Sequence, residues 1–214
     1  LLIEQGVVVA SGELGQIEKE HDLTNAKRIS LHGKSVVPGL IDSHSHVVFA
    51  GERMDEMAMR ARGDTYESIA QAGGGIVRSV SALESTSLDE LVKEARKRIQ
   101  HMKSLGVTTL EIKSGYGLSP RLEAKQLDAI EILARSEELD IRATILAHVI
   151  PKDQRNNRSN YVAEFLSKTL PDAAERSRVY YCDIFVESGA FTPEEATLIA
   201  HKAKELGLKL KLHV

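Results

Sequence analysis

The chain has 214 residues, of which 42% are hydrophobic and 28% are charged, and its formal net charge is −3. This is the composition of a globular protein, and the weakly negative balance offers no basic surface for nucleic acid or an anionic membrane. No apolar run approaches the ~20 residues that a membrane-spanning helix needs. Cys182 is the sole cysteine, which fits a reducing compartment. We therefore expect a cytoplasmic protein with no nucleic-acid or membrane partner.

Residues 1–35 are predicted to form the strands of a small β-sandwich domain. Their β-branched runs are interrupted by glycine, in "GVVVASGELG" and again in "AKRISLHGKSVV". The chain begins with Leu1 rather than methionine and ends within a strand-like run. We expect from this that both ends are cut from a longer protein.

Strands and helices alternate over residues 36–214, which predicts a second, α/β domain. Between the strands, a capping residue begins each clear helix and a glycine or proline supports its bounds (Ser87 with Gly106, Ser119 with Pro120, Thr192 with Gly207). Repeated units of this kind predict a parallel sheet, either doubly wound or closed into a barrel. The expected strands are short apolar segments at residues 36–42, 107–113, 141–150, 179–187 and 208–214.

Polar side chains at the carboxyl ends of these strands favour the barrel. A (β/α)8 barrel brings all its strand ends to one mouth, where its active site lies, whereas a flat sheet spreads them apart. We therefore expect an incomplete (β/α)8 TIM barrel with about five of its eight strands. The polar residues in question are His44, His46, Lys113, Tyr116, His148, Glu187 and His213.

His44 and His46 suggest a metal site. If they continue the strand that precedes them, residues i and i+2 point to the same side and two imidazoles can reach one ion. Two polar residues that merely end a strand would leave the same pattern. The surrounding string, "VVPGLIDSHSHVVFAG", resembles the first-strand signature of the amidohydrolase superfamily, whose members hold a catalytic metal in a (β/α)8 barrel.

Several separated motifs make the resemblance narrower. The stretch "HSHVVFAGERMDEMAMRARGDTYESIAQAGGGI" and the blocks "GVTTLEIKSGYGL", "AHVIP" and "DIFVESGAF" are similar to the imidazolonepropionase family. The resemblance extends from about residue 36 to residue 213 and implies the amino-terminal portion of such an enzyme, the first half of its barrel.

The resemblance implies a role for seven residues. His44, His46 and His213 match metal ligands, and the substrate-binding positions are matched by Arg53, Tyr66, Tyr116 and His148. A guanidinium suits a carboxylate such as the propionate arm of the substrate. The alternatives are a solvated loop arginine, core tyrosines and a core histidine. Lys113 is expected inside the barrel with a polar partner.

The catalytic residues are not expected within this sequence. The family supplies an aspartate at its eighth strand and a histidine at its sixth, and both would lie beyond Val214. The family also continues its fifth-strand motif as His-Ala-Asp-Glu, whereas Val214 follows His213 here. We expect three β–α units to be missing, because eight are needed and five are recognised.

The implied reaction is metal-dependent hydrolysis of a cyclic C–N bond, from 4-imidazolone-5-propanoate to N-formimino-L-glutamate in histidine degradation. One divalent or trivalent ion, Zn or Fe, would activate water, and the metal or His148 would polarise the ring carbonyl. Two alternatives stay open: another amidohydrolase, such as a cytosine or guanine deaminase, and a catalytically incomplete barrel fragment. We also expect a homodimer.

Overall fold

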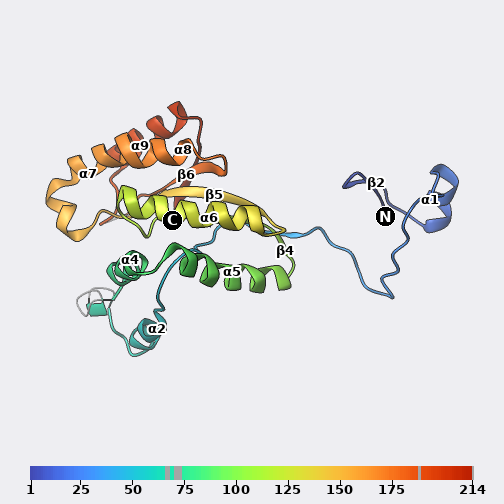
Figure 1. Cartoon of the computed structure of the whole chain (residues 1–214), viewed down its shortest axis with the longest axis horizontal. Helices are drawn as coiled ribbons and strands as arrows, with labels where there is room; N and C mark the ends of the chain where they lie inside the picture. The colour runs from blue at the N-terminus through green and yellow to red at the C-terminus, as the bar shows by residue number, and fades with distance from the viewer. Residues whose placement is uncertain (66–67, 70–73, 188, 214) are drawn as a thin grey trace. The chain divides into compact units, whose positions relative to one another are not determined.

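The computed structural model describes residues 1–65, 68–69, 74–187 and 189–213. The chain divides into two compact units, of which the first is Leu1–Pro38 and the second begins at Gly39. We describe each unit separately, and Figure 1 traces both along the chain.

The first unit contains a β-hairpin and a short helix. Strand β1 (Leu2–Glu4) pairs antiparallel with β2 (Val7–Ala10), and α1 spans Leu14–Glu20. The turn residues Gln5 and Gly6 have φ angles of 48° and 80°. This left-handed conformation is the one that two-residue hairpin turns require.

The expected strand within residues 26–37 is wrong. No strand forms there, although every residue of Leu1–Pro38 is described. Val36 and Val37 remain 55% and 72% exposed. A β-branched run becomes a strand only where a second strand pairs with its backbone groups, and this segment has no such partner.

The second unit is built on a parallel sheet of five strands. Each strand pairs with the next one in the chain, in the order β3-β4-β5-β6-β7. An order that never reverses distinguishes this sheet from a doubly wound one, which reverses at a switch point. The sheet curls into a half-barrel, and the bounds are β3 Leu40–Asp42, β4 Val107–Lys113, β5 Asp140–Ala147, β6 Val179–Phe185 and β7 Lys209–His213.

The α/β class is therefore confirmed, while the described residues form an open half-barrel rather than a complete (β/α)8 barrel. The first expected strand was too long at its start, since β3 begins only at Leu40. The third and fourth expected strands were too long at their ends, since β5 stops at Ala147 and β6 at Phe185. No helix of the described residues is both long and apolar enough to cross a bilayer.

Helices connect the strands, and α5, α6, α8 and α9 pack against the sheet (Figure 1). The three cap signals are confirmed: Ser87 accepts a hydrogen bond from Glu90 N, Ser119 accepts one from Leu122 N, and Thr192 forms a reciprocal capping box. The helices are α2 Met54–Ala61, α4 Ile76–Ser85, α5 Leu88–Ser104, α6 Pro120–Ser136, α7 Arg158–Glu164, α8 Leu170–Ala174 and α9 Pro193–Glu205, with a 3-10 turn at Lys152–Asn157 and a π turn at Phe165–Thr169.

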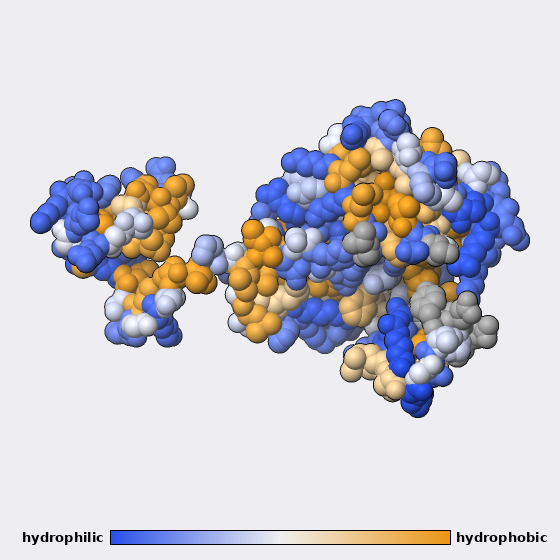
Figure 2. All heavy atoms as spheres, turned by 180° about the vertical axis from the view of Figure 1, so that it is seen from behind, coloured by the Kyte–Doolittle hydropathy of each residue, from blue (hydrophilic) through white to orange (hydrophobic). Residues whose placement is uncertain are grey.

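The hydrophobic core lies between the helices and the sheet. Ile99 of α5, Leu110 of β4 and Ile130 of α6 are fully buried there. The two edge strands, in contrast, carry exposed apolar side chains: Ile41 of β3 is 70% exposed and Leu212 of β7 is 73% exposed. Figure 2 shows apolar atoms gathered in patches on the surface of this unit.

Candidate metal centre and adjoining cavity

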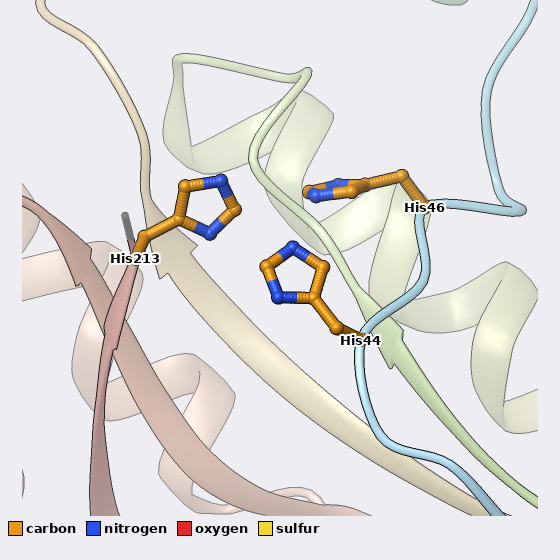
Figure 3. A group of neighbouring side chains, drawn as sticks. All are labelled: His44, His46 and His213. Carbon is orange, nitrogen blue, oxygen red and sulfur yellow. The ribbon is translucent and has the colours of Figure 1, made fainter.

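Three histidines meet where the two edge strands approach each other. His44 and His46 follow β3, and His213 ends β7. One ring nitrogen of each lies within 4.8 Å of the corresponding nitrogen of the other two. Figure 3 shows the three rings turned toward a common space. The sheet thus brings together residues about 170 positions apart in the chain, because its curl closes the distance between its first and last strands.

The sequence suggested that His44 and His46 continue the preceding strand, but the structure shows that they do not. β3 ends at Asp42, and both histidines lie in irregular backbone beyond it. They nevertheless face each other, with ring centroids 5.4 Å apart. Their orientation must therefore come from contacts that hold this segment rather than from strand geometry.

Side chains of two helices supply those contacts. Arg98 of α5 donates to the carbonyl oxygens of Val47 and Phe49 at 2.9 and 3.1 Å. Gln126 of α6 donates from Nε2 to the Val48 oxygen at 2.7 Å. The backbone is also held from the sheet, since the Lys113 amide donates to the Ser45 oxygen at 2.9 Å. The segment that carries both histidines is fixed on two sides.

His44 and His46 stay neutral at neutral pH. Burial, together with the charges of His148 and His213, lowers the pKa of His46 to about 4. Partial burial and the charge of Lys113 also lower the pKa of His44. His46 Nδ1 is buried and has no hydrogen-bond partner among the described residues. Imidazole nitrogens with free lone pairs are metal ligands, and the ring nitrogens of the three histidines lie close together, so the three residues fit a metal ion such as Zn²⁺ or iron.

A network of buried charges lies beneath the histidines. Lys113, only 1% exposed, places its Nζ 2.9 Å from Glu111 Oε1 and 2.8 Å from Asp183 Oδ2. Lys211 contacts the other oxygen of Glu111 at 2.9 Å, and Asp183 Oδ2 lies 3.1 Å from His213 Nδ1. The expectation that Lys113 is an interior residue with a polar partner is confirmed.

An open cavity of about 920 Å³ adjoins the histidines. Arg53, Tyr116 and His148 all line it, and the rings of Tyr116 and His148 lie 5.4 and 6.3 Å from that of His46. Tyr66 lies outside the described residues. The structure thus brings three of the four expected substrate-binding residues to one cavity beside the candidate metal centre.

Each of these three side chains has a defined environment. Arg53 contacts Glu56 at 2.6 Å, and Glu56 also accepts the Gly75 amide at 2.8 Å. Burial raises the pKa of Tyr116 and lowers that of His148. The two residues are therefore a protonated phenol and a neutral imidazole at neutral pH.

The tautomer of His148 follows from its partner. Its Nδ1 lies 3.0 Å from the carbonyl oxygen of Gly115. A carbonyl oxygen only accepts hydrogen bonds, so Nδ1 carries the proton and Nε2 carries the lone pair. Neutral His148 is therefore an acceptor at Nε2.

Two buried polar residues of α6 hold the loop that carries Tyr116, and sequence reasoning missed both. The Glu123 carboxyl accepts the amides of Gly115, Gly117 and Leu118 at 2.9, 2.8 and 2.8 Å, and burial raises its pKa. Gln126 accepts the Tyr116 amide at 3.0 Å through its Oε1. The sequence did offer a signal, because Glu123 and Gln126 lie three positions apart on the apolar face of their helix. Buried polar groups need hydrogen-bond partners, so this pair indicated a buried polar contact.

Asp183 was also missed. It lies in the middle of β6 and is 1% exposed. In "VYYCDIFVE" it is an acidic residue within a strand that was expected to be buried. Acidic side chains are rarely buried unless they are paired, so its position indicated a cationic partner. Its partners come from β4 and β7, and only the folded sheet identifies them.

Comparison with known proteins identifies curated relatives of one kind. No family model matches the chain. Over 214 residues, all of this chain, it is 39% identical to the curated imidazolonepropionase of Clostridium tetani and 41% identical to that of Fusobacterium nucleatum. The corresponding protein of Alkaliphilus oremlandii is 37% identical over 220 aligned positions, which cover 99% of this chain. The chain spans about half the length of these curated relatives, 51–52% in each case.

Proposed function

We propose that this chain, whose resemblance to the amino-terminal portion of imidazolonepropionases is confirmed along its whole length, forms the metal-binding half of such an enzyme. The complete enzyme would hydrolyse the ring C–N bond of 4-imidazolone-5-propanoate to give N-formimino-L-glutamate, a step of histidine degradation. The observation that carries the proposal is the meeting of His44, His46 and His213 beside a cavity lined by Arg53, Tyr116 and His148.

We further propose that the sheet is part of a closed (β/α)8 barrel of the amidohydrolase type. Residues 36–214 would supply its first five strands, and residues 1–35 would belong to a small β-sandwich domain. The exposed apolar residues of the edge strands β3 and β7 support this, because a complete barrel has no free edges. The other half of the relatives' length is sufficient for three further β–α units, which would contribute the expected aspartate and histidine.

The proposed metal ligands of this chain are His44, His46 and His213. A bound Zn²⁺ or iron ion would supply Lewis-acid chemistry, which polarises a carbonyl group and makes water more acidic. The contribution of the chain is to prepare two of these ligands, His44 and His46. The low pKa of His46 removes proton competition at neutral pH, and the contacts of Arg98 and Gln126 fix the segment that carries His44 and His46.

The cavity residues would bind and orient the substrate. Arg53 would hold the propionate carboxylate, with Glu56 keeping the guanidinium in place. The Tyr116 hydroxyl would donate a hydrogen bond to the ring, and His148 Nε2 would accept one from a ring N–H. This role for His148 differs from the carbonyl polarisation suggested by sequence, because its Nδ1 proton is already donated to Gly115.

Replacement of Arg53 by alanine tests the proposal. Loss of charge-assisted hydrogen bonds worth about 2–3 kcal/mol should raise KM for imidazolone propionate about 30- to 150-fold, with a smaller change in kcat. The matched control is Arg62→Ala, because Arg62 lies on the same segment and its side chain is 68% exposed. If Arg53→Ala leaves KM unaltered, the cavity serves a substrate without a carboxylate arm, as in a cyclic deaminase.

A further inference from the structure

Asp183 is a buried carboxylate that contacts both a buried lysine and one of the three histidines. It is 1% exposed, and each of its oxygens has a partner. Oδ1 accepts the amide of Ile184 at 3.0 Å. Oδ2 lies between two cationic or polar donors, Lys113 Nζ at 2.8 Å and His213 Nδ1 at 3.1 Å. One carboxylate oxygen thus connects a buried lysine of β4 to the candidate metal ligand of β7.

The contact defines the proton position on His213. A carboxylate held next to a lysine ammonium accepts hydrogen bonds, so the proton of His213 lies on Nδ1. In the neutral ring with this tautomer, the other nitrogen, Nε2, carries the lone pair. Figure 3 shows the ring of His213 turned toward His44 and His46, and its centroid lies 4.7 Å from that of His44.

The charge of Lys113 makes it possible for Asp183 to accept a hydrogen bond from His213 as a buried carboxylate. An isolated buried carboxylate is unfavourable, but a buried carboxylate that is paired and hydrogen-bonded is tolerated. Lys113 makes that pairing with Asp183 and is itself shared with Glu111 at 2.9 Å. The buried cluster of Glu111, Lys113 and Asp183 therefore has a structural reason to exist directly beneath His213.

We propose that Asp183 is a positioning residue for metal binding, which fixes both the ring orientation and the Nδ1–H tautomer of His213 so that Nε2 is the ligand atom. The inference rests on the proposed metal site and adds to it the residue that prepares one ligand. Carboxylate partners of ligating histidines contribute about 10- to 100-fold to metal affinity.

The first experiment needs no substitution. Long-range ¹H–¹⁵N correlation spectra of the metal-free protein report which imidazole nitrogen carries the proton. We expect the Nδ1–H tautomer for His213. A proton on Nε2 of His213 would overturn the inference without affecting the assignment of His44 and His46 as ligands.

The second experiment measures Zn²⁺ affinity by competition with a chromophoric chelator. Asp183→Asn should weaken binding about 10- to 100-fold and give a mixture of His213 tautomers in the same spectra. The control is Asp140→Asn, because Asp140 also lies in the sheet but is 40% exposed and pairs with Arg142 rather than a histidine. It should leave affinity and tautomer unchanged.

The outcomes separate the two levels of the proposal. Wild-type binding of Zn²⁺ together with equal affinity in Asp183→Asn would refute the role of Asp183 while leaving the metal site intact. A wild-type protein that binds no Zn²⁺ or iron would refute the metal site itself, and the inference with it.

Discussion

Replacing Lys113 by methionine should strongly destabilise the protein, because it leaves two carboxylates buried without their shared cation. Lys113 and Asp183 are each 1% exposed and Glu111 is 4% exposed. Removing one partner of a buried ion pair costs about 3–5 kcal/mol. Glu111 keeps Lys211 at 2.9 Å, whereas among the described residues Asp183 keeps only His213 and a backbone amide. We therefore expect a loss of about 3 kcal/mol in the free energy of unfolding, at the lower end of this range.

The pH dependence of the stability lost in Lys113→Met tests the reasoning more strictly than the loss at one pH. Burial alone would raise the pKa of Asp183, but the hydrogen bonds and charges of Lys113 and His213 together outweigh it and hold the pKa below its usual value. In the wild-type protein this stabilisation is present above the unfolded pKa and is lost as the pH falls through the folded pKa. Without Lys113, burial should raise the pKa of Asp183. The folded variant would then take up a proton first, and its stability deficit should shrink between pH 7 and pH 5.

Urea unfolding followed by circular dichroism at pH 7 and pH 5 measures both effects. Lys93→Met is the control, because Lys93 is 62% exposed in its pair with Glu90 and should cost less than about 1 kcal/mol. The reasoning is refuted if Lys113→Met costs no more than this control, or if its deficit is the same at both pH values.

Two further predictions concern the site. In the metal-free protein, NMR titration should show His46 protonating near pH 4, because burial and its histidine neighbours lower its pKa to about 4. The unfolded chain binds this proton at a higher pH than the folded protein does. The free energy of unfolding should therefore decrease as the pH falls from about 6.5 toward 4. A midpoint near 6.5 would contradict the burial. Gly117→Ala should destabilise the protein by about 1–3 kcal/mol in urea unfolding, because a Cβ there would lie 2.4 Å from the backbone nitrogen of Glu123. The control Gly15→Ala, with open space around it, should show no such loss.

The sequence by itself predicted much of the local structure of the second unit, although the ends of β5 and β6 were misplaced. Strand–helix alternation, the caps at Ser87, Ser119 and Thr192, and the glycines that end helices all act within a few residues of chain, so they are encoded locally. The same holds for the motifs on which the family resemblance depends. The prediction failed at residues 26–37 and at the start of β3, where a β-branched run has no neighbouring strand and local propensity is therefore not enough.

The resemblance grouped the three histidines in advance, but only the tertiary structure explains why they meet and identifies the buried partners that hold the site. His213 reaches His44 only because the five-stranded sheet curls, so that side chains at the carboxyl ends of its first and last strands face a common space. Asp183 finds Lys113 and His213 across three different strands, and Gln126 joins the His46 segment to the Tyr116 loop through one buried amide. These contacts depend on sheet curvature and on the need of buried polar groups for partners, and both are properties of the folded chain as a whole.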